Sequence, residues 1–363
     1  MTQSVWKQLD NMKATKTLFA LILSTTLFAQ AKFLPANILQ SDNYLSHHIL
    51  VAEKSTHKLY LYETQSDEPR LIKTFQIATG KKAGNKIFQG DHRTPEGIYH
   101  FSEFLPHKSL LERHGKAGEI YGVGAFVMNY PNPIDRLKGK TGGGIWLHST
   151  NDETRIDKGL DSRGCLVAHN KHLIDLSQYI ELNKTLIVVT HDVKYLKRET
   201  WQRNKNSLTK TLNKWLEAWQ TENFESYKEQ YHTSKFRDYR HKNYKNYMNY
   251  KRAVFSNPGT PEISIENVSI LKNNDYAVIT FIQNYNSNTI TDTGKKTLYL
   301  MKDLYYNWKI VAEEWTKSGL EKEHGPSVAF KPRLKFFESS NPKEIFTSQL
   351  NLKDDSSEGV SNN

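Results

Sequence analysis

Residues 146–170 read WLHSTNDETRIDKGLDSRGCLVAHN and contain Cys165, the only cysteine of the 363-residue chain. A thiol becomes a useful nucleophile when a base removes its proton, or when its pKa falls below the free value of about 8.5. His148 is the candidate base, because the end of a strand and a later turn can be neighbours in space. Gly164 lets a substrate approach the backbone, so the amides of Gly164 and Cys165 could bind an oxyanion. Taken alone, the pattern also fits a structural histidine and a small buried thiol.

The sequence around this stretch predicts a β-rich first domain with little helix. Residues 47–54, 57–64 and 70–80 alternate apolar and polar side chains and are separated by turn-forming residues, which is typical of an antiparallel meander. Further strands are expected on both sides of the cysteine. One helix is predicted from Asn170, which could be its N-cap. We expect this domain to span residues 48–195, after a polar lead-in at 32–47.

A different pattern follows a polar segment at 196–203, which we expect to be a linker. Apolar residues then recur at spacings of three and four, as on one face of a helix. Strand-like segments come after that helix, so residues 204–325 are predicted to form a small α+β domain. Residues 326–363 are expected to be a polar tail, disordered at its end. The helical face consists of Leu208, Leu212, Trp215, Leu216 and Trp219.

The cysteine stretch resembles the signature of the L,D-transpeptidase (YkuD-type) family. That signature has a His-Ser or His-Gly pair, about fifteen residues, and then Ser-X-Gly-Cys with an aliphatic residue. Here these elements are His148-Ser149 and Ser162-Arg163-Gly164-Cys165-Leu166. Upstream segments also resemble the family in the same order: LYLYE at 59–63, ATGK at 78–81, GD at 90–91, TPEG at 94–97 and VMNYPN at 127–132.

The resemblance implies a mainly β, sandwich-like catalytic domain with short helices that acts on peptidoglycan stem peptides. Cys165 would be the nucleophile and His148 the general base, with the backbone carbonyl of Ser149 orienting the imidazole. The Gly164 and Cys165 amides would form the oxyanion hole. Such enzymes attack the L-centre carbonyl of meso-diaminopimelate and expel the terminal D-alanine, leaving a thioester. Ser162 and Arg163 are the expected substrate-binding residues.

Two positions depart from the family pattern. Position 163 is often His and is Arg here, while position 167 is commonly Arg and is Val here. The usual contacts to substrate carboxylates could therefore be rearranged. We hypothesise that Arg163 binds a stem carboxylate through its guanidinium, against the alternative of a solvated or structural arginine.

The second domain is similar to the nuclear-transport-factor-2-like fold, a cone-shaped α+β domain that encloses a pocket. A transpeptidase-type domain followed by such a module resembles the L,D-carboxypeptidases that set cell shape. Hydrolysis of stem tetrapeptides to tripeptides is therefore the preferred prediction. The alternatives are crosslinking by an L,D-transpeptidase and a wall-binding scaffold that has lost catalysis.

Residues 227–252 carry eight Lys or Arg residues against two acids, interleaved with tyrosines. This composition suits nucleic acid, whose bases stack on aromatic rings, and suits wall glycan equally. Wall glycan is the preferred ligand, because the N-terminus described below predicts that the protein is exported. The remaining alternative is a solvated helix face whose tyrosines pack inward.

The N-terminus predicts export. Lys13 and Lys16 precede an apolar run at 18–28, and small residues at 29 and 31 suit a signal peptidase. Residues 1–31 are thus an expected signal peptide, and Met12 is the expected start of translation. The formal charge of +11 favours acidic partners, so we expect a periplasmic protein that binds peptidoglycan stem peptides and glycan. No nucleic acid, metal or cofactor is predicted, and membrane contact is expected only through the uncleaved signal. Residues 32–47 could support a homodimer.

Overall fold

A computed structural model describes residues 33–63, 68–256, 261–288, 290–317, 320, 330–339, 341 and 344–345. The predicted signal peptide, the Met12 start and the end of the predicted tail lie outside these residues. None of the described helices has both the length and the hydropathy required to cross a membrane.

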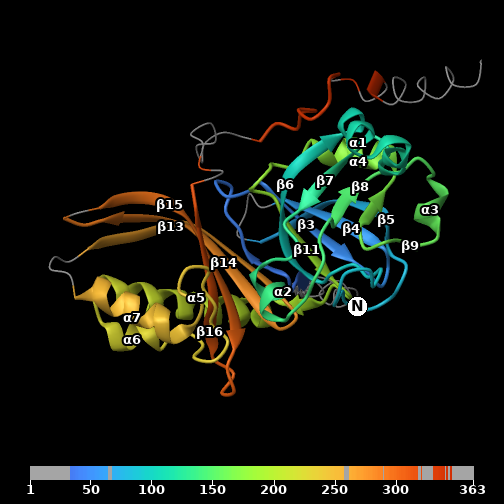
Figure 1. The fold of residues 1–363 in the computed structure, drawn as a ribbon. Helices are drawn as coiled ribbons and strands as arrows, with labels where there is room; N and C mark the ends of the chain where they lie inside the picture. The colour runs from blue at the N-terminus through green and yellow to red at the C-terminus, as the bar shows by residue number, and fades with distance from the viewer. Residues whose placement is uncertain are drawn as a thin grey trace, which may run out of the picture. The chain divides into compact units, whose positions relative to one another are not determined.

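The first domain is built on a nine-stranded sheet with the strand order β10-β8-β7-β6-β11-β3-β4-β5-β9. Strand β10 also pairs with β5, so the sheet closes on itself around a hydrophobic core. The prediction of a mainly β first domain is therefore confirmed (Figure 1). Its strands are β3 His48–Glu53, β4 Lys58–Glu63, β5 Arg70–Gly80, β6 Gly97–Pro106, β7 Gly124–Met128, β8 Trp146–His148, β9 Leu160–Ser162, β10 Leu166–Ala168 and β11 Leu186–Thr190.

Short helices connect these strands: α1 His107–His114, the 3-10 helix η1 Gly115–Tyr121, α2 Pro133–Leu137, α3 Thr154–Asp157 and α4 Asn170–Ser177. The N-cap of α4 is His169, so the prediction of Asn170 as N-cap is wrong by one residue. The Asn170 side chain instead accepts a hydrogen bond from the Val123 N–H at 3.2 Å. Val123 lies 47 residues away in the sequence, so this contact could not be predicted from the residues at the start of the helix.

The second domain is α+β, as predicted. Three helices, α5 Arg198–Gln220, α6 Phe224–Lys228 and α7 Tyr244–Phe255, lie on one side of a five-stranded sheet with the order β16-β15-β14-β13-β2 (Figure 1). The long strands are β13 Glu262–Asn273, β14 Tyr276–Asn286, β15 Thr291–Lys302 and β16 Trp308–Thr316. The predicted apolar helix face is confirmed, since Leu208, Leu212, Trp215 and Trp219 are buried in the core of this domain.

Two segments expected to be irregular are structured. In the predicted lead-in, β1 Phe33–Pro35 pairs with β12 Tyr195–Lys197, and β2 Ile38–Gln40 pairs with β13 of the second domain. The predicted linker at 196–203 contains the start of α5. Both segments carry apolar side chains that the domain cores bury, including Leu34, Ile38 and Trp201. The side chains that could have supported a homodimer are thus used inside the chain, and dimerisation stays a prediction.

The predicted polar tail contains an aromatic segment that packs on the first domain. The Phe336 ring lies with its centroid 5.1 Å from those of both Phe104 and Phe126. Phe337 lies 5.3 Å from Phe104, and Ile345 is buried in the same core. A segment with few apolar residues can pack in this way, because the first domain presents Phe104 and Phe126 as its partners.

Candidate active site

The pairing of β8 with β10 brings His148 and Cys165 together. The two strands are parallel, with Leu147 opposite Leu166 and His148 opposite Val167. Extending this register by one residue places Cys165 opposite Trp146. Side chains alternate between the faces of a sheet, so Cys165 and His148 point to the same face, two residues apart along the strand direction. Distance in sequence is thereby converted into proximity in space, as predicted.

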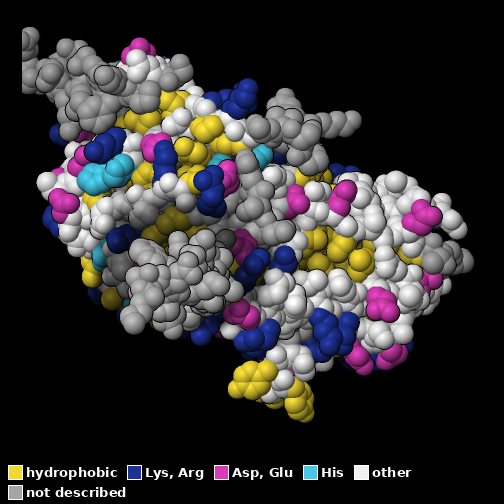
Figure 2. All heavy atoms as spheres, turned by 180° about the vertical axis from the view of Figure 1, so that it is seen from behind, with side chains coloured by type: hydrophobic (Ala, Val, Ile, Leu, Met, Phe, Trp, Pro, Cys, Tyr) yellow, Lys and Arg dark blue, Asp and Glu magenta, His cyan; other side chains and the backbone are white. Residues whose placement is uncertain are grey.

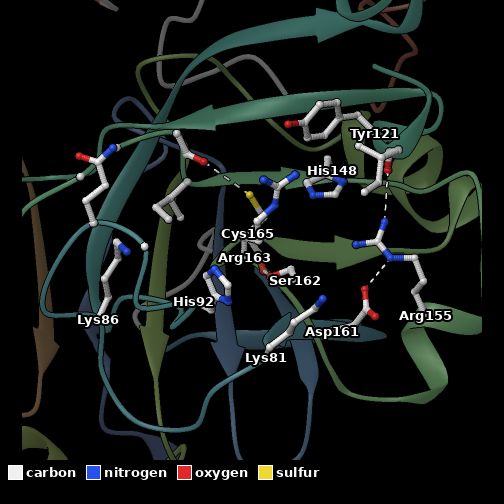
Figure 3. A pocket seen from close by; sticks show the side chains of 17 residues that line it. Lys81, Lys86, His92, Tyr121, His148, Arg155, Asp161, Ser162, Arg163 and Cys165 are labelled. Atoms are coloured by element: carbon white, nitrogen blue, oxygen red, sulfur yellow. Dashed lines mark hydrogen bonds and ion pairs between the residues drawn. The ribbon is translucent and has the colours of Figure 1, made fainter. Parts of the chain in front are cut away.

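Both side chains line a cavity of about 770 Å³ (Figure 3). Its walls come from the loop after β5, the glycine-rich segment before β8, the end of η1, helix α3 and the Ser-Arg-Gly-Cys turn. The cavity is large enough for a peptide-sized ligand. Its lining residues are Lys81, Lys86, Gln89, Gly90, His92, Ile120, Tyr121, Gly142, Gly143, Gly144, Ile145, His148, Arg155, Asp161, Ser162, Arg163 and Cys165.

The imidazole of His148 is held in one orientation. Its Nδ1 lies 2.5 Å from the backbone carbonyl oxygen of Ser149. A carbonyl only accepts, so a neutral ring must carry its proton on Nδ1, and Nε2 is left as the basic nitrogen. The Tyr121 ring packs edge-on against the imidazole, with centroids 4.9 Å apart. The contact expected for the Ser149 carbonyl is therefore present.

Burial favours the neutral forms of both groups. It lowers the pKa of His148 to about 4, although the hydrogen bond to Ser149 acts in the opposite direction. It raises the pKa of the Cys165 thiol to about 11, although a hydrogen bond from Trp146 and the charge of Arg155 oppose it. The resting thiol donates to the Gly144 carbonyl oxygen at 3.5 Å, and no hydrogen bond of the described residues joins it to His148. Activation by a base is favoured over a preformed thiolate.

The Ser162 hydroxyl builds the turn before the cysteine. It donates to the Cys165 carbonyl oxygen at 2.6 Å and accepts from the Gly164 N–H at 3.0 Å. Ser162 lines the cavity, but its hydroxyl is bonded within the turn, and its substrate-binding role stays a prediction. The Gly164 amide already has an acceptor, which also departs from the predicted oxyanion hole. The Cys165 amide is the donor that the motif still offers to an oxyanion.

Gly164 is required by its backbone geometry. Its φ is +129°, a conformation that residues with a side chain rarely adopt. An added Cβ would lie 2.9 Å from the carbonyl oxygen of Arg93. Only glycine lets the turn pass this close to the neighbouring loop and present Cys165 to the cavity.

Arg155 on α3 is a cavity residue that the sequence reasoning missed. Its Nε donates to Asp161 Oδ2 at 2.5 Å, and its Nη1 donates to Thr150 Oγ1 at 3.0 Å. No contact within the described part of the chain engages Nη2. The guanidinium is therefore fixed by one edge beside the catalytic pair. Its sequence signal was weak, because α3 has only four residues and its direction cannot be read from periodicity.

Arg163 lines the same cavity beside the cysteine (Figure 3). Its exposed side chain faces the cleft, as hypothesised. Lys81 and Lys86 lie on the loop after β5; Lys86 is buried and paired with Asp91 at 2.8 Å. The cationic residues lining the cavity outnumber its one acid, Asp161. The cavity thus favours a ligand that carries carboxylates.

Comparisons with known proteins agree with this geometry. Residues 47–189 match the YkuD family, the L,D-transpeptidase catalytic domain. The structure of Bd1075 from Bdellovibrio bacteriovorus is 30% identical to this chain, with a TM-score of 0.68; the match covers 79% of this chain and 99% of Bd1075. The chain belongs to the L,D-transpeptidase (YkuD) family. Its function is accordingly L,D-transpeptidase-like and related to peptidoglycan, a substrate that lies outside the cytoplasm.

The second domain also has a match. Residues 207–314 match the Cds6 C-terminal NTF2-like domain, which confirms the predicted fold. The helical cell shape determining protein Pgp2 from Campylobacter jejuni is 24% identical, with a TM-score of 0.61, and the match covers 78% of this chain and 95% of Pgp2. That likeness concerns the fold alone. Among curated proteins, no sequence matches.

The departures from the YkuD pattern have a structural setting. Val167 is fully buried and packs with Ala78 and Ile156. Ile156 does not line the cavity. Its neighbour Arg155 does, and its side chain points into the cavity (Figure 3). Helix α3 therefore contacts the buried Val167 through Ile156 and contributes the guanidinium of Arg155 to the cavity.

Proposed function

We propose that the protein is an L,D-carboxypeptidase that removes the terminal D-alanine from peptidoglycan stem tetrapeptides. The observation that carries the proposal is the shared cavity of Cys165 and His148, with the imidazole fixed by the Ser149 carbonyl. Hydrolysis is preferred over crosslinking because a transpeptidase-type domain followed by an NTF2-like module resembles the L,D-carboxypeptidases that set cell shape, and the fold is similar to that of a helical cell shape determining protein.

The first half of the reaction forms a thioester. Nε2 of His148 takes the thiol proton as the sulfur of Cys165 attacks the L-centre carbonyl of meso-diaminopimelate. The Cys165 amide donates to the oxyanion, and the Gly164 amide can join it if its bond to Ser162 opens. The imidazolium then protonates the leaving nitrogen, and D-alanine departs.

The second half regenerates the enzyme. With D-alanine gone, Nε2 of His148 is neutral again and can remove a proton from water in the cavity. The hydroxide attacks the thioester carbonyl, and the sulfur leaves and recovers its proton from the imidazolium. The product is a tripeptide. An amine from a second stem peptide in place of water would give a crosslink instead.

We propose that Arg155 binds a carboxylate of the stem peptide. Its Nε and Nη1 are held by Asp161, Thr150 and the carbonyl of Ile120. Nη2 is then a positioned donor for a carboxylate, a charge-assisted contact. Arg163 is proposed as a second, more mobile carboxylate ligand, because its side chain is exposed.

We further propose that the protein is exported to the periplasm by residues 1–31. The basic residues, the apolar run and the small residues at 29 and 31 support this. N-terminal sequencing of the secreted protein would test it: a mature chain starting at Lys32 is expected, and retention of the leader would contradict the proposal.

The test of function is a product assay. The purified chain is incubated with soluble disaccharide tetrapeptide, and the products are identified by mass. Tripeptide with free D-alanine is expected, and Cys165→Ala should give neither. A crosslinked dimer would show the transpeptidase alternative, and no turnover by a folded protein would support the scaffold alternative.

A further inference from the structure

The turn between β15 and β16 presents an apolar tip. Leu304, Tyr305 and Tyr306 are consecutive and are 93%, 84% and 78% exposed. In Figure 2 the hydrophobic side chains at this tip stand out beyond the surrounding surface. Single exposed apolar residues are normal, but three adjacent large ones at a projecting turn mark an interaction site.

The tip is rigid. Asp303 accepts hydrogen bonds from the N–H groups of Tyr305 and Asn307, both at 2.9 Å. The Asp303 N–H in turn donates to the Asn307 carbonyl oxygen at 2.9 Å. The turn therefore holds its apolar side chains outward before any partner arrives, which reduces the entropy lost on binding.

Lysines surround the tip. Lys302 and Lys309 flank it in sequence, and Lys302 lies 5.7 Å above the Tyr306 ring. Lys302 also acts electrostatically on Lys272. The acids that interact with these lysines already have partners: Asp303, which lies near Lys309, caps the turn, and Asp275, which lies near Lys272, pairs with Lys138 at 2.6 Å. The surface around the apolar tip is therefore positive, although the Lys309 amine also donates to the backbone carbonyl oxygen of Glu229.

We propose that this hairpin docks the enzyme onto an anionic phospholipid surface. Leu304, Tyr305 and Tyr306 would enter the interfacial region, where tyrosine is favoured, and the lysines would meet the headgroups. A glycan strand fits less well, because a convex tip offers no groove and Leu304 has no ring to stack on a sugar. This contact is independent of the signal segment, to which the sequence alone had confined membrane binding, and of the proposed reaction.

The test labels the tip itself. Leu304→Cys in the Cys165→Ala background leaves one thiol, which is coupled to a polarity-sensitive fluorophore in the otherwise full-length chain. Vesicles of phosphatidylglycerol mixed with phosphatidylcholine should shift its emission to the blue, and vesicles of phosphatidylcholine alone should not. The matched control is Tyr239→Cys, whose side chain is 99% exposed elsewhere in the second domain.

Lys302→Gln with Lys309→Gln should weaken the vesicle response about tenfold or more, because each basic residue near an anionic surface contributes about 1 kcal/mol. An unchanged fluorophore, or an equal shift at position 239, would overturn the proposal. So would a shift caused by raising protein concentration without lipid, which would identify a second copy as the partner, or by soluble glycan. Turnover of soluble tetrapeptide by Leu304→Ser should stay unchanged, so failure here and failure of the proposed reaction are distinguishable.

Discussion

The Cys165–His148 site of the first domain and the Glu313 cluster of the second domain hold their ionisable groups in opposite ways. In the first domain, Cys165 and His148 lie near each other without a hydrogen bond, and burial drives both toward neutrality. In the second domain, Glu313 pairs with Lys296 at 2.6 Å and accepts from Tyr247 at 3.1 Å. Burial alone would raise the pKa of Glu313, but Lys296 and Lys251 outweigh it and the pKa is lowered.

The difference separates reactivity from stability. A neutral, partly exposed thiol and a buried neutral imidazole can exchange a proton when substrate arrives, so the neutral forms keep the site ready. A buried carboxylate with two lysines and tyrosines is already satisfied, and its removal would leave uncompensated charge. Lys251 shows that burial disfavours the charged form of a lysine in this cluster, because it lowers the pKa of Lys251 to about 8. This residue belongs to the basic, tyrosine-rich segment, which is therefore not simply a solvated helix face.

The largest expected effect is on the catalytic side of this comparison. His148→Ala should lower kcat/KM about 10²–10⁴-fold, because the general base is lost. The matched control is His92→Ala, which removes another histidine of the same cavity. Steady-state kinetics on soluble tetrapeptide measures both. Equal losses in the two variants would contradict the assignment of the base.

Glu313→Gln tests the contribution of the buried Glu313 cluster to stability. It should lower the free energy of unfolding by about 3–5 kcal/mol, because Lys296 and Lys251 would stay buried without their carboxylate. Glu314→Gln on the same strand is the control, since Glu314 is half exposed and pairs with Arg136 at 3.8 Å. Urea unfolding measures both variants. Turnover by folded Glu313→Gln should be normal; a specific loss of turnover would break the separation.

Gly164→Ala tests whether the turn geometry is needed for reaction. We expect kcat/KM to fall about 10²-fold, because the clash with the Arg93 carbonyl displaces the thiol. Circular dichroism should show the fold retained. Gly143→Ala is the control, since a Cβ there would meet no atom within 4 Å. Similar activities of the two variants would show that the reaction does not need the backbone geometry of Gly164.

The two cavity arginines should differ. Arg155→Ala is expected to raise KM about tenfold or more, the value of a charge-assisted hydrogen bond, and Arg155→Lys should recover part of it. Arg163→Ala and Arg163→Lys should have smaller effects, since Arg163 is exposed. If both Arg163 variants bind and turn over substrate like the parent, its carboxylate role is excluded. If Arg155→Ala does so, the proposed positioned donor is wrong.

The reactivity of the Cys165 thiol should also depend on pH. Because the pKa of Cys165 is raised to about 11, its thiolate fraction should rise about tenfold per pH unit between pH 7 and 10. Alkylation by iodoacetamide should follow this slope. A rate plateau between pH 5 and 8 would show a thiolate–imidazolium pair. Cys165 and His148 would then be ionised like Glu313 and its lysines, and the proposed difference between the two sites would be wrong.

The sequence predicts that His148 and Cys165 share one cavity because the determinants of this geometry are local. His148 is oriented by the next residue, and the Gly164 turn lies beside Cys165 in the chain. Arg155 lies in the same stretch but was missed, because its direction depends on a four-residue helix. Tyr121 comes from a distant segment, and only the fold brings its ring onto His148.

Domain edges were predicted less well. Sequence periodicity identified the long strands and the face of α5, which repeat over many residues. Strands β1 and β2 have three residues each, too short for a periodic signal. The aromatic pair Phe336 and Phe337 was assigned to a polar tail because its partner, the Phe104 surface, lies far away in sequence.

The chain ends are exchanged between the domains. Strand β2, before the catalytic sheet, joins the sheet of the second domain, while Phe336, after the second domain, packs on the first. A single cut near residue 197 would therefore deprive each half of a segment that the other half carries. Neither module can be excised as a contiguous fragment, so an evolutionary or engineered swap of the second domain must also carry over both ends.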